Sequence, residues 1–280
     1  MGLYYKLHRK EDIVIKAKAD NIRQESAISI VKRIIFVSLP ITLSAIMSTL
    51  NKNVDAMTVT RILKKFMSES EAKIQYGILS GKVDTLITLP LSFNVAFSTA
   101  LVPTISAAIA KKDVRSASKR ISFSMLLTMI IGLPCTFGMV VFAQPIIDLI
   151  FPNAPSGAVL LQISAFTVIF SVLAQTANGA LQGLGKIMVP AISGFAGLII
   201  KIISNIILIQ IPWIGVNGAA IGSNLNNIVV FLISYIMLAK TIKLDLKPVK
   251  FIIKPLIATA IMSVCSYTLY KILLRNFGYK

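Results

Sequence analysis

Hydrophobic residues gather in seven long runs that are separated by short polar segments. The runs cover residues 34–57, 78–108, 121–147, 158–182, 187–211, 216–239 and 251–274. A helix needs about 20 apolar residues to cross the ~30 Å hydrocarbon core of a bilayer, and each run is longer than that. Membrane-spanning strands would alternate polar and apolar residues over about 10 positions, whereas the run 199–209 does not alternate. The pattern predicts an all-α integral membrane protein with about seven transmembrane helices.

The composition supports a membrane location. Hydrophobic residues make up 55% of the 280 residues and charged residues only 14%, against about 25% charged residues in soluble domains. A chain of this kind has too few polar side chains to cover the surface of a water-soluble globule.

The net charge of +18 comes mainly from basic residues between alternate hydrophobic runs. Such residues occupy cytoplasmic loops according to the positive-inside rule, so we expect a cytoplasmic N-terminus and no nucleic-acid partner. The basic residues are Lys6, Arg9, Lys10, Lys16, Lys18, Arg23, Lys32 and Arg33, then Lys111, Lys112, Arg115, Lys119 and Arg120, then Lys240, Lys243, Lys247 and Lys250. Four others depart from this rule and fall on the expected outer side: Arg61, Lys64, Lys65 and Lys73.

Polar residues within the runs recur at helical spacing. In the first run, Ser44, Ser48, Asn51, Asp55 and Thr58 are separated by four, three, four and three positions, which places them on one helix face. Two explanations stay open: small and hydroxylated residues let membrane helices pack closely, and polar stripes also line water-filled pathways. The pair Gly218 and Gly222 fits close packing.

Charged residues inside the runs are the best candidates for a cavity or an internal ion pair, because a charge facing lipid is costly. Asp55 lies about 31 Å along its helix from the inner side, and Lys82 and Asp84 lie about 6–9 Å in from the outer side. We therefore expect Lys82 to lie between the two carboxylates. Lys201 is about 21 Å from the inner start of its run, so we expect it to have an internal partner or an anionic ligand.

The sequence carries no catalytic or metal-binding constellation. It has a single histidine, His8, and two cysteines, Cys135 and Cys265, that lie inside hydrophobic runs. The short turn Gly183–Lys186 lacks the strand and the further glycines of a nucleotide-binding motif. We expect no enzyme activity, no metal and no cofactor.

Several short motifs together resemble a known family. They are Leu39–Ser44 (LPITLS), Leu89–Ser92 (LPLS), Ser98–Ser106 (STALVPTIS), Gln182–Lys186 (QGLGK) and Gly215–Ser223 (GVNGAAIGS). In this order they resemble the second lobe of the multidrug/oligosaccharidyl-lipid/polysaccharide exporter superfamily, and most of all the branch of stage V sporulation protein B and the related lipid II flippases.

The resemblance implies one lobe of a two-lobe transporter fold like that of multidrug exporters. Residues 1–33 would be a cytoplasmic interlobe linker, 34–240 a six-helix C-terminal lobe and 241–280 an additional transmembrane helix. The first lobe and the last helix have no counterpart in the chain. We therefore expect a split product or fragment that works with the missing lobe from another polypeptide, or with a second copy of itself.

The function that the resemblance implies is movement of a lipid-linked, pyrophosphate-bearing oligosaccharide or peptidoglycan precursor across the bacterial plasma membrane by alternating access, in sporulation cell-wall synthesis for example. Two alternatives stay open: a lobe of a cation-coupled multidrug antiporter, and an inactive truncated fragment. The partners would be this substrate, membrane lipids and the other lobe. The candidate residues of the substrate cavity are Asn51, Asp55, Lys82, Asp84, Asn94, Lys201 and Asn205.

Overall fold

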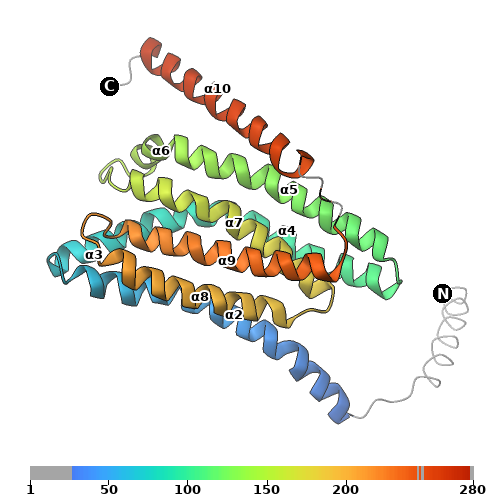
Figure 1. Ribbon diagram of the computed structural model, residues 1–280. Coiled ribbons are helices and arrows are strands. Elements are labelled where there is room, and N and C mark those ends of the chain that lie inside the picture. The colour runs from blue at the N-terminus through green and yellow to red at the C-terminus, as the bar shows by residue number, and fades with distance from the viewer. Residues whose placement is uncertain (1–26, 245, 247–248, 278–280) are drawn as a thin grey trace, which may run out of the picture. The chain divides into compact units, whose positions relative to one another are not determined.

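The computed structural model describes residues 27–244, 246 and 249–277 (Figure 1). Two units divide the chain, residues 1–39 and residues 40–280. The described part of the first unit is the beginning of helix α2 (Ala27–Leu63), and the rest of α2 belongs to the second unit. Most of the expected linker, residues 1–33, lies outside the described residues, so the proposed domain boundaries stay predictions.

Helices follow one another along the described chain, which contains no strand. After α2 come α3 (Glu69–Gly77), the π-helix η1 (Ile78–Val83), α4 (Asp84–Ala110), α5 (Val114–Val141), α6 (Ala143–Ile150), α7 (Ala158–Gly183), α8 (Met188–Ile209), α9 (Asn217–Thr241), the π-helix η2 (Val249–Ile253) and α10 (Lys254–Phe277). Seven stretches of the described chain are long and apolar enough to cross a membrane. The predicted all-α fold with seven spans is confirmed.

The second hydrophobic span begins earlier than the hydrophobic pattern indicates. It runs without a break from Glu69 to Ala110 through α3, η1 and α4. Its start is set by a capping box, in which the Glu71 backbone N–H donates to Ser68 Oγ and the Ser68 backbone N–H donates to Glu71 Oε2. The helix therefore starts with a polar first turn, nine residues before residue 78, where hydrophobicity alone places its start.

The third span ends earlier than predicted. A single helix over 121–147 is wrong, because α5 ends at Val141 and α6 starts at Ala143. Pro145 gives the reason: it has no N–H to donate to the carbonyl of Val141, and its ring would clash there in a continuous helix. Backbone N–H groups in the first turn of a helix have no intrahelical acceptor, so a proline there removes no hydrogen bond. One helix therefore ends before Phe142, and a new one begins after it.

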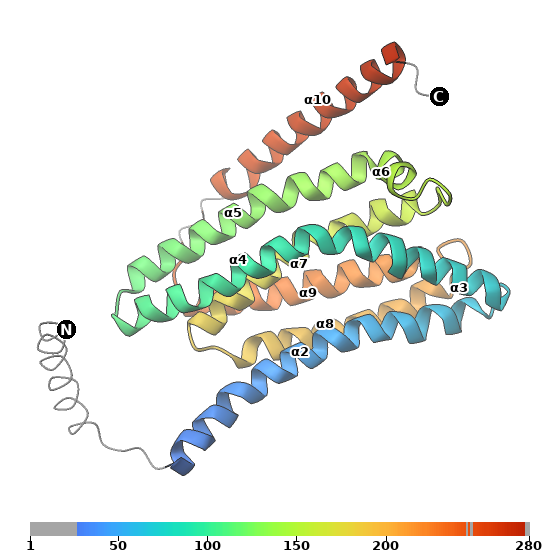
Figure 2. The ribbon, with the colours of Figure 1, turned by 180° about the vertical axis from the view of Figure 1, so that it is seen from behind.

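Helix α7 is the centre of the second unit and packs against α4, α5 and α9 (Figures 1 and 2). Helix α8 packs against α9, and α10 packs against α5. Small residues allow these close contacts. A Cβ on Gly179 would lie 2.7 Å from the backbone O of Ser98 on α4, and one on Gly218 would lie 2.8 Å from the backbone C of Leu208 on α8.

The outward faces of the spans are apolar. Large hydrophobic side chains are exposed along every long helix, among them Phe93, Phe123, Ile203 and Leu232. Exposed apolar surface of this extent suits lipid as the surrounding solvent.

Candidate functional site

A polar cavity of about 790 Å³ lies among the helices of the second unit. Its walls come from α2, the α3–η1–α4 segment, α7, α8 and α9. The polar lining residues are Ser48, Asn51, Lys52, Asp55, Tyr76, Ser80, Asp84, Thr85, Thr88, Ser92, Ser164, Thr167, Ser171, Gln175, Lys201, Ser223, Asn226 and Asn227. Polar side chains therefore gather in a cavity among helices whose outward surface is apolar, and apolar side chains such as Ile87 and Leu91 complete its wall.

Helical spacing explains why these polar groups share one cavity. On α4 the lining residues Asp84, Thr88 and Ser92 follow at intervals of four, and on α7 Ser164, Thr167, Ser171 and Gln175 follow at three or four. The hydroxyls of Thr88 and Ser92 each donate to the carbonyl four residues earlier, at 2.6 and 2.8 Å. These bonds occupy the hydroxyl protons and leave oxygen lone pairs free to accept from a ligand or water.

An ion pair joins α2 to α8 at one wall of the cavity. Lys201 Nζ lies 2.6 Å from Asp55 Oδ2 and donates to the main-chain oxygen of Asn51 at 2.9 Å. Asp55 is 8% exposed and Lys201 5%. The expected internal partner of Lys201 is therefore Asp55, and the two opposite charges compensate each other where water is scarce.

Asn205 completes the environment of the Asp55 carboxylate. Its Nδ2 donates to Asp55 Oδ1 at 2.9 Å and to Thr58 Oγ1 at 3.0 Å. A Cβ on Gly222 would lie 2.4 Å from Asn205 Oδ1, so only glycine lets α9 approach this amide. Both carboxylate oxygens of Asp55 thus have a donor from α8.

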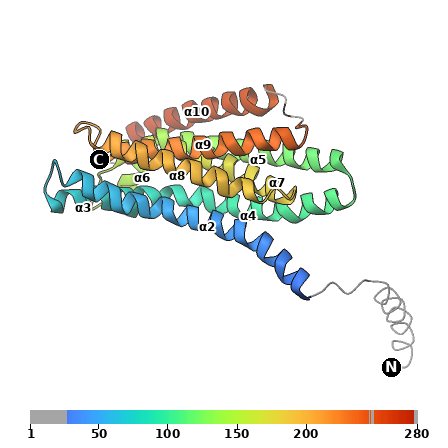
Figure 3. The same cartoon turned by 60° about the horizontal axis from the view of Figure 1, so that its bottom comes forward.

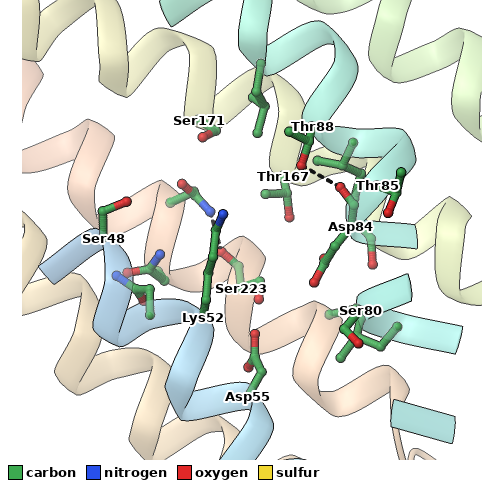
Figure 4. A pocket seen from close by; sticks show the side chains of 18 of the residues that line it. Ser48, Lys52, Asp55, Ser80, Asp84, Thr85, Thr88, Thr167, Ser171 and Ser223 are labelled. Carbon is green, nitrogen blue, oxygen red and sulfur yellow. Dashed lines mark hydrogen bonds between the residues drawn. The ribbon is translucent and has the colours of Figure 1, made fainter. Parts of the chain in front are cut away.

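Lys52 and Asp84 carry the remaining charges of the cavity. Figure 4 shows both side chains projecting into it, Lys52 from α2 and Asp84 from the first turn of α4. Ion pairs within the described chain involve Lys64, Lys73 and Lys201, and none involves Lys52 or Asp84. One lysine and one carboxylate are therefore available to a ligand.

Lys82 lies elsewhere, and the prediction that it sits between Asp55 and Asp84 is wrong. Its Nζ donates to the main-chain oxygens of Ala154 and Ser156, and it lies 5.4 Å from the centre of the Phe151 ring. The π-helical turns of η1 add one residue per turn relative to an α-helix. A depth calculated for a regular α-helix does not say in which direction a side chain points from a π-helix.

Asn94 and Asn205 do not line this cavity. Asn94 is buried, and its Nδ2 donates to the main-chain oxygen of Val172 and to Gln175 Oε1, both at 3.0 Å. It also lines a smaller, mostly apolar pocket of about 240 Å³ between α4, α5 and α7. Asn94 thus joins α4 to α7 and orients Gln175, which does line the large cavity.

Several residues that line the cavity were not among the candidates predicted from the sequence. Lys52 follows Asn51 directly and lies four positions after Ser48, so the stripe on the first span pointed to it. Ser223, Asn226 and Asn227 on α9 are spaced by three and four, a signal of the same kind that was available in the span 216–239.

A polytopic helical protein with a charged, hydroxyl-lined cavity between its spans has the architecture of a membrane transporter. The sequence profile of the lipid II flippase MurJ family matches residues 13–280. The chain belongs to this family.

Curated relatives from Bacillus subtilis (strain 168) agree with this assignment. The uncharacterized membrane protein YabM is 29% identical over 214 residues, which are 74% of this chain and 40% of that protein. Stage V sporulation protein B is 24% identical over 232 residues, 82% of this chain and 44% of that protein. The chain thus spans less than half the length of these relatives.

Solved structures share the fold. A lipid II flippase MurJ in an inward closed conformation matches with a TM-score of 0.65 at 18% identity, over 88% of this chain and 50% of that chain. A multidrug resistance MATE family transporter in an outward-facing conformation matches with a TM-score of 0.61 at 20% identity, over 86% and 53%. The expected fold is confirmed, and lipid and drug transporters share it.

Proposed function

We propose that this chain forms one lobe of a flippase that moves a lipid-linked oligosaccharide, with a pyrophosphate between lipid and sugar, across the plasma membrane. The observation that carries the proposal is the large polar cavity within the membrane-spanning helices of a lipid II flippase family member. The similarity to stage V sporulation protein B supports a peptidoglycan precursor in sporulation as the substrate class.

The chemistry of the cavity fits the head group of such a substrate. Hydroxyls and amides on α4, α7 and α9 offer acceptors and donors of the kind that sugar hydroxyls pair with. Lys52 offers an ammonium that no described carboxylate compensates, which suits a phosphate oxygen. Lys201 does not serve this role, because Asp55 neutralises it.

A single lobe gives only one wall of a transport path. Alternating access needs a second bundle that rocks against the first around a shared site. A wall lined by Lys52, Asp84 and many hydroxyls would be unstable against lipid, so the working unit includes an opposing lobe over this cavity.

The charge at the ends of the second unit supports an orientation. The C-terminal ends of α4, α7 and α9 lie at one end of the second unit in Figure 1, and the turns beside them carry Lys111, Lys112, Arg115, Lys186 and Lys243. Under the positive-inside rule this end faces the cytoplasm, and a cytoplasmic N-terminus stays a prediction from the sequence.

A cation-coupled drug antiporter is the second candidate. The uncompensated carboxylate of Asp84 favours it, since a carboxylate in a transporter cavity can bind a proton or a cationic compound. In that case Asp84 would carry the coupling, because Asp55 already has Lys201 as its counter-ion.

Reconstitution in liposomes separates these functions. The chain is incorporated into liposomes that contain lipid II, either alone or together with the N-terminal half of stage V sporulation protein B. The fraction of lipid II that reaches the outer leaflet is measured by its cleavage with an enzyme that cannot cross the membrane. We expect translocation only when an opposing lobe is present, and translocation by the chain alone would refute the need for a different lobe. Absence of translocation in both samples, together with ion-driven dye efflux, would refute the flippase.

A further inference from the structure

The Asp55 carboxylate sits in an environment that would suit a small monovalent cation if Lys201 were absent. Lys201 Nζ has two oxygens within hydrogen-bond distance, Asp55 Oδ2 at 2.6 Å and the main-chain oxygen of Asn51 at 2.9 Å. One of these oxygens carries a formal charge and the other is a carbonyl, which are ligands that hard cations prefer.

Further oxygens around the pair lack hydrogen-bond donors. The side-chain amide oxygens of Asn51, Asn205 and Asn226 are buried and accept no hydrogen bond from the part of the chain that the structure describes. Asn51 and Asn226 line the cavity beside Lys201, and Asn205 contacts Asp55. Asn205 Oδ1 lies against Gly222 and Asn226 Oδ1 against Gly197, so both oxygens lie at the α8–α9 contact next to the pair and not on the carboxylate itself. Buried acceptors without a donor are unusual, and a cation nearby can satisfy such groups.

We propose that Lys201 is a built-in counter-ion, which fills a potential cation site at Asp55 and removes any need for an exchangeable ion there. The charge balance supports this: a single ammonium compensates the single carboxylate, so a cation of charge one would restore neutrality if the ammonium were removed. The other charged groups that face the cavity, Lys52 on α2 and Asp84 on α4, are not part of the pair.

Thermal unfolding of the purified full chain in detergent tests the proposal, with sodium, lithium, potassium or choline chloride at equal ionic strength. The wild type should unfold at the same temperature in each salt. Lys201→Asn shortens the side chain and supplies an amide oxygen as a ligand. The unfolding temperature of this variant should rise with sodium or lithium but not with choline, because a ligand that binds only the folded state stabilises that state.

Matched variants give the controls. Lys201→Met keeps the length of the side chain and fills the site with an apolar group, so it should show no response to a particular cation. The double variant Asp55→Asn/Lys201→Asn should lose the response of Lys201→Asn.

Two results would overturn the proposal. One is a sodium-specific stabilisation of the wild type that Asp55→Asn abolishes, which can be measured even if Lys201→Asn does not fold. The other is a folded Lys201→Asn variant that responds to no cation. Neither readout needs transport activity, so a failure here is distinct from a failure of the flippase proposal.

Discussion

Asp55 on α2 and Lys201 on α8 form a buried ion pair with 2.6 Å between Oδ2 and Nζ, although 146 positions separate them in the chain. Figure 3 shows the two helices side by side. Through this pair and the bonds of Asn205, polar groups hold α2 to the bundle on its cavity side. In a bilayer, apolar helix surfaces are already surrounded by apolar lipid, so their burial against another helix gives little hydrophobic free energy. Hydrogen bonds and ion pairs between helices therefore help to determine which helices pack together.

The pair should be far more sensitive to loss of one partner than to loss of both. Lys201→Met leaves a buried carboxylate without its counter-ion and should lower the free energy of unfolding by about 3–5 kcal/mol. The double variant Asp55→Asn/Lys201→Met should recover most of that loss, because no buried charge remains. Equilibrium unfolding of the purified variants measures both, and a double variant no more stable than the single one would contradict this account.

Lys52 should matter for transport and not for stability. Lys52→Gln removes the uncompensated ammonium of the cavity, and a hydrogen bond to a charged group contributes about 1.5–3 kcal/mol, so transport of a pyrophosphate-linked substrate should fall about 10–100-fold. The unfolding temperature should stay close to that of the wild type, because Lys52 is exposed in the cavity.

Lys73→Gln is the control for Lys52→Gln. Lys73 pairs with Glu69 on the surface, 2.8 Å apart, and does not line the cavity. Transport that falls equally in both variants would show that the effect is not specific to the cavity.

The contact between α8 and α9 should depend on Gly218. A methyl group at this position would meet backbone atoms of Leu208 and Ile209 at 2.8–2.9 Å, so Gly218→Ala should destabilise the protein by about 1–3 kcal/mol. Gly138 in α5 has no neighbouring atom within 4 Å of its would-be Cβ, and Gly138→Ala should be neutral or stabilising by up to about 1 kcal/mol. Unfolding temperatures of the two alanine variants test the difference directly.

Lys82 should stabilise the loop before α7 and not the cavity. Lys82→Met removes the donor to Ala154 and Ser156, so hydrogen exchange of residues 152–157 should become faster. Exchange in α8 should not change, since Lys82 has no contact with the Asp55–Lys201 pair. Faster exchange in α8 would instead support the depth-based placement beside Asp55.

The hydrophobic pattern predicted the number and type of the spans because a bilayer imposes length and apolarity on each helix separately. It also pointed to Asp55 and Lys201, since a charge deep in a span needs a partner. The hydrophobic pattern could not place Lys82, because the direction of the Lys82 side chain depends on π-helical turns that local hydrophobicity does not predict. It did not single out Lys52, because a residue at a span end can equally face solvent. The α9 amides Asn226 and Asn227 lie in the middle of their span, where their spacing fits both helix packing and a cavity, and only the packing of the helices turns them toward the cavity.

Site-specific photocrosslinking tests the central claim most directly, namely that the polar cavity is one wall of the path of a lipid-linked oligosaccharide. A photoreactive residue is placed at Ser92 or Ser223 in the cavity, and at Ile203 or Leu232 on the exposed apolar surface as controls. With the opposing lobe present, we predict crosslinks to lipid II at the two cavity positions and crosslinks to bulk phospholipid alone at the two controls. Crosslinks from Ser92 and Ser223 to bulk phospholipid, with none to lipid II, would contradict the account.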